Sequence, residues 1–171
     1  MEPLELLKPL TCNMKSASIH ELKQEMSQLK AAELSALCLR LARFKKENKE
    51  LLTYLLFEAH DEDGYIRSVK KEIDEQFEGI NLSHLYFVKK SLRKILRGIN
   101  KHIRYTGSKQ AEVEWLTHFL TTLKETGIPF EKNTMINNIY NSQLKKLFAA
   151  IHTLHEDLQY DYLRAAEKLG K

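Results

Sequence analysis

The chain has 171 residues, of which 43% are hydrophobic and 29% are charged. This balance is typical of a globular protein and excludes a disordered or collagen-like chain. The 27 Lys and Arg residues exceed the 23 Asp and Glu residues by only four, so the net charge by itself does not indicate a nucleic-acid or membrane binder.

Targeting and redox signals are weak. Cys12 and Cys38 are too few for a disulfide framework, which favours a reducing compartment. The first residues lack the basic and apolar regions of a signal peptide, and the apolar run Leu51–Phe57 is far too short to span a membrane. We therefore expect a cytoplasmic protein that makes no use of a membrane.

The N-terminal half predicts a tail followed by helices. Residues 1–17 contain two prolines and little periodicity, which predicts a tail or extended segment. Ser18 and Glu21 form the pattern of a capping box, so a helix should begin there. The segments around Leu34–Ala42 and Leu51–Ala59 repeat apolar residues at helical spacing, with Cys38 in the apolar row of the first. The acidic turn 61–64 then precedes another amphipathic helix.

The C-terminal half continues the helical pattern. A long helix is predicted from Ser83 to Tyr105, with Gly107 as a left-handed cap and Ser108 as the cap of the next helix. After Pro129, apolar residues recur at helical spacing as far as Leu169, which indicates one very long helix or two.

These patterns predict an all-α fold of about six to seven helices, with residues 18–171 forming a single all-helical domain. The architecture is open between a multi-helix bundle and a helical-repeat-like stack. The second is suggested because residues 50–56 match residues 114–120 at four of seven positions, although leucine-rich helices often match by chance.

The strongest chemical signal is the charge of the predicted helix 83–105. No Asp or Glu occurs between Glu78 and Glu112, whereas Lys and Arg recur along one face of this helix beside a tyrosine, over about 27 Å. Like charges three and four residues apart destabilise a helix, so an external or internal anion should compensate them. The candidate binding residues are Tyr86, Lys89, Lys90, Arg93, Lys94, Arg97, Lys101 and Arg104.

Two sources of compensation remain open. An acidic protein or a nucleic acid could bind this face, with Lys90, Arg93, Arg97 and Lys101 providing the positioning contacts and Tyr86 stacking on a base. Alternatively, the acidic stretch 58–78 could pair with it inside the fold or across a symmetric homo-oligomer.

Other sites have little support in the sequence. The turn 61–64 places Lys70 where a calcium loop needs glutamate, so a helix cap is the better interpretation. His152 and His155 stand one helical turn apart but lack the glutamate of a di-iron motif. Cys38 is expected in the core, and no nucleophile elbow or glycine-rich phosphate loop occurs. We therefore expect a non-catalytic binding module without cofactor or metal, and secondarily a homo-oligomeric assembly protein.

Overall fold

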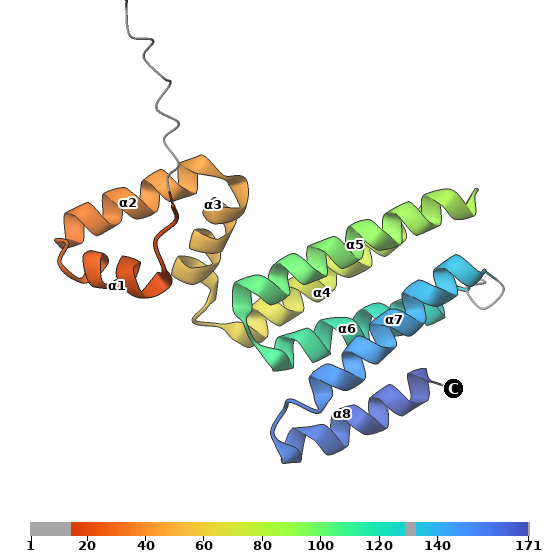
Figure 1. Ribbon diagram of the computed structural model, residues 1–171. Coiled ribbons are helices and arrows are strands. Elements are labelled where there is room, and N and C mark those ends of the chain that lie inside the picture. The colour runs from red at the N-terminus through yellow and green to blue at the C-terminus, as the bar shows by residue number, and fades with distance from the viewer. Residues whose placement is uncertain (1–14, 129–132, 171) are drawn as a thin grey trace, which may run out of the picture. The chain divides into compact units, whose positions relative to one another are not determined.

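The computed structural model describes residues 15–128 and 133–170. Within these ranges the regular structure is helical throughout, which confirms the all-α prediction, and eight α-helices stand where six to seven were expected (Figure 1). The chain divides into two compact units, residues 1–48 and 49–171. The single domain expected over residues 18–171 stays a prediction, and most of the tail expected over 1–17 lies outside the described residues, as does Cys12.

The described part of the first unit, residues 15–48, consists of short helices without a core. It contains α1 (Ile19–Ser27), α2 (Ala31–Phe44) and the start of α3 (Lys46–Thr53), none of which contributes a buried residue. The predicted capping box is present, because the Glu21 amide donates to Ser18 Oγ at 3.3 Å and the Ser18 amide donates to Glu21 Oε2 at 2.7 Å.

The core position predicted for Cys38 is wrong. Cys38 is exposed, and the apolar residues Leu37 and Leu41 on the same helix are also exposed. The physical reason is size: helices of nine and fourteen residues cannot enclose a hydrophobic interior. The helical periodicity therefore predicted the helix correctly, but it did not predict whether the apolar face of the helix is buried.

The second unit contains the hydrophobic core. Its helices are the remainder of α3, the π-helix η1 (Tyr54–Glu58), α4 (Glu62–Glu78), α5 (Leu85–Thr106), α6 (Lys109–Glu125), α7 (Thr134–Ile151) and α8 (Glu156–Leu169). Helix α6 lies at the centre, since α4, α5, α7 and α8 all pack against it. Trp115, Phe119 and Leu123 of α6 are completely buried.

Local capping signals account for the helix ends. Asp61 begins α4 by accepting a hydrogen bond from the Gly64 amide at 2.9 Å, which confirms the cap interpretation of the acidic turn. Gly107 ends α5 with φ of 64°, a left-handed conformation in which a Cβ would be strained. Ser108 then accepts from the Ala111 amide and begins α6.

The segment after Pro129 forms two helices. Helix α7 ends at Ile151, and α8 begins after His155, whose Nδ1 accepts from the Asp157 amide at 3.5 Å. His152 and His155 therefore lie in the exposed turn between α7 and α8 and not on successive turns of one helix. Their side chains do not share a helix face as the spacing indicated.

Candidate functional site

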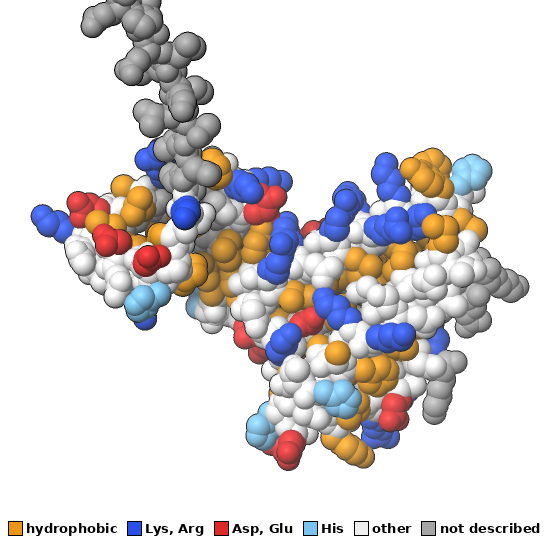
Figure 2. All heavy atoms as spheres, viewed as in Figure 1, with side chains coloured by type: hydrophobic (Ala, Val, Ile, Leu, Met, Phe, Trp, Pro, Cys, Tyr) orange, Lys and Arg blue, Asp and Glu red, His pale blue; other side chains and the backbone are white. Residues whose placement is uncertain are grey.

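The basic face of α5 carries cations that no described carboxylate compensates. Lys90, Arg93, Lys94, Arg97 and Arg104 are exposed, and among the described residues their side chains form no ion pair or hydrogen bond. Figure 2 shows Lys and Arg side chains gathered over α5, with hydrophobic side chains at the end where this helix begins. Positive charge is thus presented to solvent along most of one helix.

The acidic helix α4 does not neutralise this face within the protomer. Three of its carboxylates lie near other groups: Glu72 Oε2 lies 3.4 Å from His102 Nε2, Asp74 Oδ1 lies 2.6 Å from His118 Nε2, and Glu75 pairs with a lysine on α4 itself. The described structure therefore offers no support for internal compensation of α5 by residues 58–78.

Two lysines of the predicted set have partners in the protein. Lys101 Nζ lies 2.9 Å from Glu50 Oε2, and the lysine side chain is largely covered. Lys89 Nζ lies 3.6 Å from the sulfur of Met135 on α7, a weak contact that leaves its charge uncompensated. Lys101 stays a predicted binding residue, but its charge already stabilises the junction of α3 and α5.

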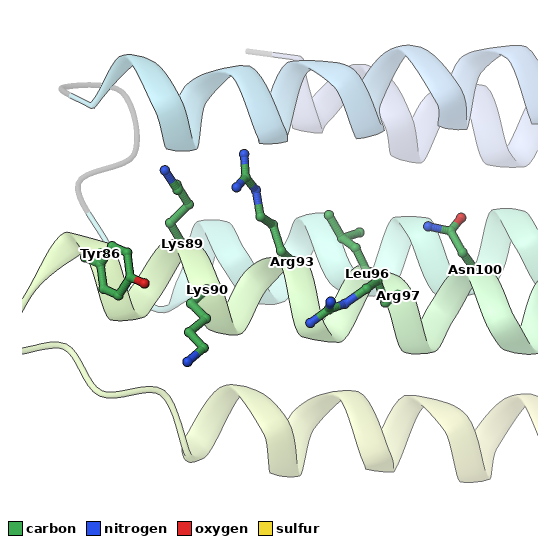
Figure 3. A pocket seen from close by; sticks show the side chains of 7 residues that line it. All are labelled: Tyr86, Lys89, Lys90, Arg93, Leu96, Arg97 and Asn100. Carbon is green, nitrogen blue, oxygen red and sulfur yellow. The ribbon is translucent and has the colours of Figure 1, made fainter. Parts of the chain in front are cut away.

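A cavity of about 500 Å³ lies along the basic face. Its lining combines five of the predicted residues with two that the sequence did not indicate: Tyr86, Lys89, Lys90, Arg93, Leu96, Arg97 and Asn100. Figure 3 shows Lys89 and Arg93 extending toward α7, whereas Lys90 extends toward α4. Lys94 and Arg104 are not among the described lining residues.

A second cavity of about 310 Å³ continues the first one toward α7. It shares Arg93 and Leu96 with the first cavity, and α7 contributes Met135, Asn138, Ile139, Ser142 and Gln143. These five residues follow the spacing i, i+3, i+4, i+7 and i+8, which is one face of a helix. We call the two cavities together the α5–α7 groove. None of its described lining residues is acidic.

The sequence could not have indicated the α7 side of this groove. The side-chain amides of Asn138 and Gln143 on α7 form no unusual pattern in the sequence. Only the folded chain shows which face of α7 lies opposite α5. Lys146 Nζ of α7 donates to Asn100 Oδ1 of α5 at 2.7 Å and also lies 3.3 Å from Glu112 Oε1, a buried carboxylate on α6. This network holds the two walls in place.

The first turn of α5, together with Leu82 just before it, adds an aromatic and apolar surface to the charged one. Leu82, Leu85, Tyr86 and Phe87 are all at least 40% exposed. The Tyr86 and Phe87 ring centroids lie 5.6 Å apart at an interplanar angle of 73°. Tyr86 is 66% exposed and lies near Lys90 in the groove, so its ring is accessible to a ligand.

A second polar cluster joins α4, α6 and α8. Lys70 Nζ of α4 lies 2.5 Å from Glu114 Oε2 of α6, and the Tyr162 hydroxyl of α8 donates to Glu114 Oε1. Burial by itself would raise the pKa of Glu114, but the hydrogen bonds from Lys70 and Tyr162 outweigh it and hold this pKa below its ordinary value. The cluster contains no nucleophile aligned with a base, so we assign it a structural role.

The third polar cluster surrounds His102, on the side of α5 that faces the core. His102 Nδ1 lies 2.7 Å from the Tyr65 hydroxyl, and the ring also contacts Trp115 and Tyr105. Its buried Nε2 forms no hydrogen bond with the described residues, although Glu72 Oε2 lies 3.4 Å away. Burial lowers the pKa of His102, although the nearby carboxylate of Glu72 acts in the opposite direction.

This environment predicts a pH dependence of stability. Because the folded-state pKa of His102 is lower than the value of about 6.5 expected in the unfolded chain, the unfolded state binds more protons as the pH falls. The folded state has its full stability above about pH 6.5 and loses stability as the pH falls from there through the lower folded-state pKa of His102. Urea unfolding at several pH values should show that the free energy of unfolding decreases less at acidic pH for His102→Gln than for the wild type. Parallel pH profiles for the wild type and the variant would contradict this assignment.

No protein-family model matches the chain, and comparisons with curated proteins and with solved structures also give no match. Within the described ranges, no helix is long and apolar enough to cross a membrane. Over the same residues, no group of three or more His, Cys, Asp or Glu side chains is placed to hold a metal ion. The physical features of the α5–α7 groove therefore carry the functional conclusion.

Proposed function

We propose that this protein is a non-catalytic helical binding module that binds an acidic partner, a nucleic acid or an acidic protein, along the basic face of α5. The observation that carries the proposal is the row of exposed cations without a described carboxylate partner, of which Lys90, Arg93 and Arg97 line a cavity. A cytoplasmic setting suits such a module, because both classes of partner are abundant there.

The chemistry of the face supports an anionic ligand. Arginine presents a rigid fork of donors that fits phosphate and carboxylate groups, and Arg93 and Arg97 stand one helical turn apart. Cations that repel one another on a free helix gain interaction energy when a polyanion binds. A binding partner would thus provide the compensation that α4 does not.

The first test is the binding of wild-type protein to three fluorescent polyanions: single-stranded DNA, double-stranded DNA and poly-glutamate. We expect micromolar or tighter binding of at least one of them at about 50 mM salt, with log Kd rising linearly with log salt because bound counterions are released. The measurement is fluorescence anisotropy over a salt series. If the protein binds none of the three polyanions at this salt concentration, the proposed function is refuted.

A second candidate function is a homo-oligomeric assembly in which acidic and basic helices pair between subunits. The observation that favours it is the acidic start of α4, where Glu62 and Asp63 are exposed and form no ion pair with a described residue. Sedimentation should then show self-association that weakens as salt increases. A salt-independent monomer would exclude this second candidate and leave the first one intact.

A further inference from the structure

We propose that the α5–α7 groove binds a single-stranded nucleic acid, with the phosphates along the cations of α5 and the bases directed toward the amides of α7. This inference rests on the proposed function, since it names the class of polyanion that the basic face binds. It goes further because it assigns a role to α7, which carries none of the residues selected from the sequence.

The groove has the length of a short oligonucleotide. The α5 wall runs from Tyr86 to Asn100, which is about 21 Å at the rise of an α-helix. At an axial rise of about 3.4 Å per nucleotide in a stacked strand, this length corresponds to about six nucleotides, and to fewer if the strand is stretched. Because the two cavities share Arg93 and Leu96, a strand could contact both walls at once.

The α7 wall has free polar groups that suit base edges. The side chains of Asn138, Ser142 and Gln143 form no hydrogen bond with other described residues. An amide provides both a donor and an acceptor, and base edges also present both. The carboxylates of an acidic peptide accept only, so they could pair with the NH2 groups of Asn138 and Gln143 but not with the amide oxygens.

Tyr86 supplies a stacking surface at one end of the groove. Its exposed ring lies beside Lys90 (Figure 3), so a base on the ring would have its phosphate close to a lysine. Aromatic rings interleaved with cations are the usual means of binding single strands without strong sequence preference.

The limited apolar surface argues against an acidic amphipathic helix as the occupant. Such a helix needs several exposed apolar anchor positions in the groove. Leu96 is only 8% exposed and Ile139 is partly buried, so among the described lining residues Met135 is the one aliphatic side chain that is widely exposed. The cations of α5, the side-chain amides of α7 and the Tyr86 ring must therefore supply most of the binding energy.

The surroundings of α5 also argue against duplex DNA. A recognition helix enters the major groove, about 12 Å wide, as a protruding element. Helix α5 packs against α4 and α6, and its Asn100 is hydrogen-bonded to Lys146 of α7. With neighbours on its flanks, α5 cannot enter a duplex groove, whereas an unpaired strand can lie on its exposed face.

The test compares two ligands of equal charge. One is oligothymidine of about twelve nucleotides, and the other is an abasic oligomer with the same number of phosphates. We expect the wild type to bind oligothymidine at least about tenfold more tightly, because stacking and base-edge contacts are lost in the abasic ligand. The variants Tyr86→Ala and Asn138→Ala/Gln143→Ala should each reduce this preference severalfold while leaving the affinity for the abasic oligomer unchanged.

Matched controls separate stacking from folding defects. Tyr160→Ala removes a tyrosine that is 71% exposed on α8, outside the groove, and should retain the full preference for oligothymidine. Tyr86→Phe retains an aromatic face and should also retain most of the preference for oligothymidine. Circular dichroism verifies that each variant is as helical as the wild type.

The possible failures are distinguishable. Equal binding of oligothymidine and the abasic oligomer, a preference for duplex DNA, or binding of poly-glutamate alone would each overturn this inference while leaving the polyanion-binding function in place. Absence of binding to every polyanion would overturn both proposals.

Discussion

Replacing Lys90, Arg93 and Arg97 together by glutamate is expected to weaken the binding of oligothymidine at least 100-fold at about 0.1 M salt. Each phosphate contact on a single strand contributes about −0.7 to the slope of log K against log salt. Three lost contacts therefore remove a slope of about 2, which at about 0.1 M salt, one decade below 1 M, corresponds to about 100-fold in the binding constant. The three new carboxylates add repulsion. These residues are selected because they line the groove without a described carboxylate partner.

Lys101 is left unchanged in this variant for a structural reason. Its ammonium group pairs with Glu50, so a glutamate at position 101 would place two carboxylates together and disturb the contact of α3 with α5. A loss of binding in such a variant could then reflect local unfolding. The three selected cations have no such role among the described contacts.

The matched control is Arg67→Glu/Arg164→Glu/Lys168→Glu, which changes the net charge by the same amount at exposed positions on α4 and α8. We expect a much smaller loss, because distant charges act only through a screened field. Anisotropy titrations over a salt series should show the log–log slope reduced by about 2 in the groove variant and nearly unchanged in the control. Equal losses in both variants would show that overall charge, and not the groove, binds the strand.

Trp115→Ala is expected to lower the free energy of unfolding by about 3–5 kcal/mol, the usual cost of removing a large buried aromatic side chain. Trp115 is completely buried on α6, and its Nε1 donates to the backbone carbonyl of Ile66 on α4 at 3.2 Å. Its ring also lies 6.0 Å from that of Tyr65 and 6.1 Å from that of His102. The substitution therefore opens a cavity where α4, α5 and α6 meet.

Urea unfolding followed by circular dichroism measures this effect. Trp115→Phe retains a ring but loses the indole donor, so it should cost less than the alanine variant, about 1–3 kcal/mol for the unpaired Ile66 carbonyl. Tyr160→Ala at an exposed site should change the free energy by no more than about 0.5 kcal/mol. A loss below about 1 kcal/mol for Trp115→Ala would contradict the placement of this residue at the centre of the core.

Local features of the sequence determined the helices and their ends. Ser18, Asp61, Gly107 and Ser108 lie at the helix ends that their residue types predict, because capping involves hydrogen bonds over two to four residues. The basic face of α5 was also visible, since residues three and four apart share a face of any α-helix. The fold class and one wall of the candidate groove could thus be predicted from short-range patterns in the sequence.

Contacts between distant segments were decided only by the tertiary structure. The sequence could not show that Asn138 and Gln143 lie across a groove from Arg93, that Glu50 pairs with Lys101, or that Cys38 is exposed. Each depends on which faces of which helices meet, and this is set by the packing of many side chains over the whole unit. An amphipathic pattern indicates that a helix has an apolar face. The surrounding helices decide whether that face is covered and which residues the polar face contacts.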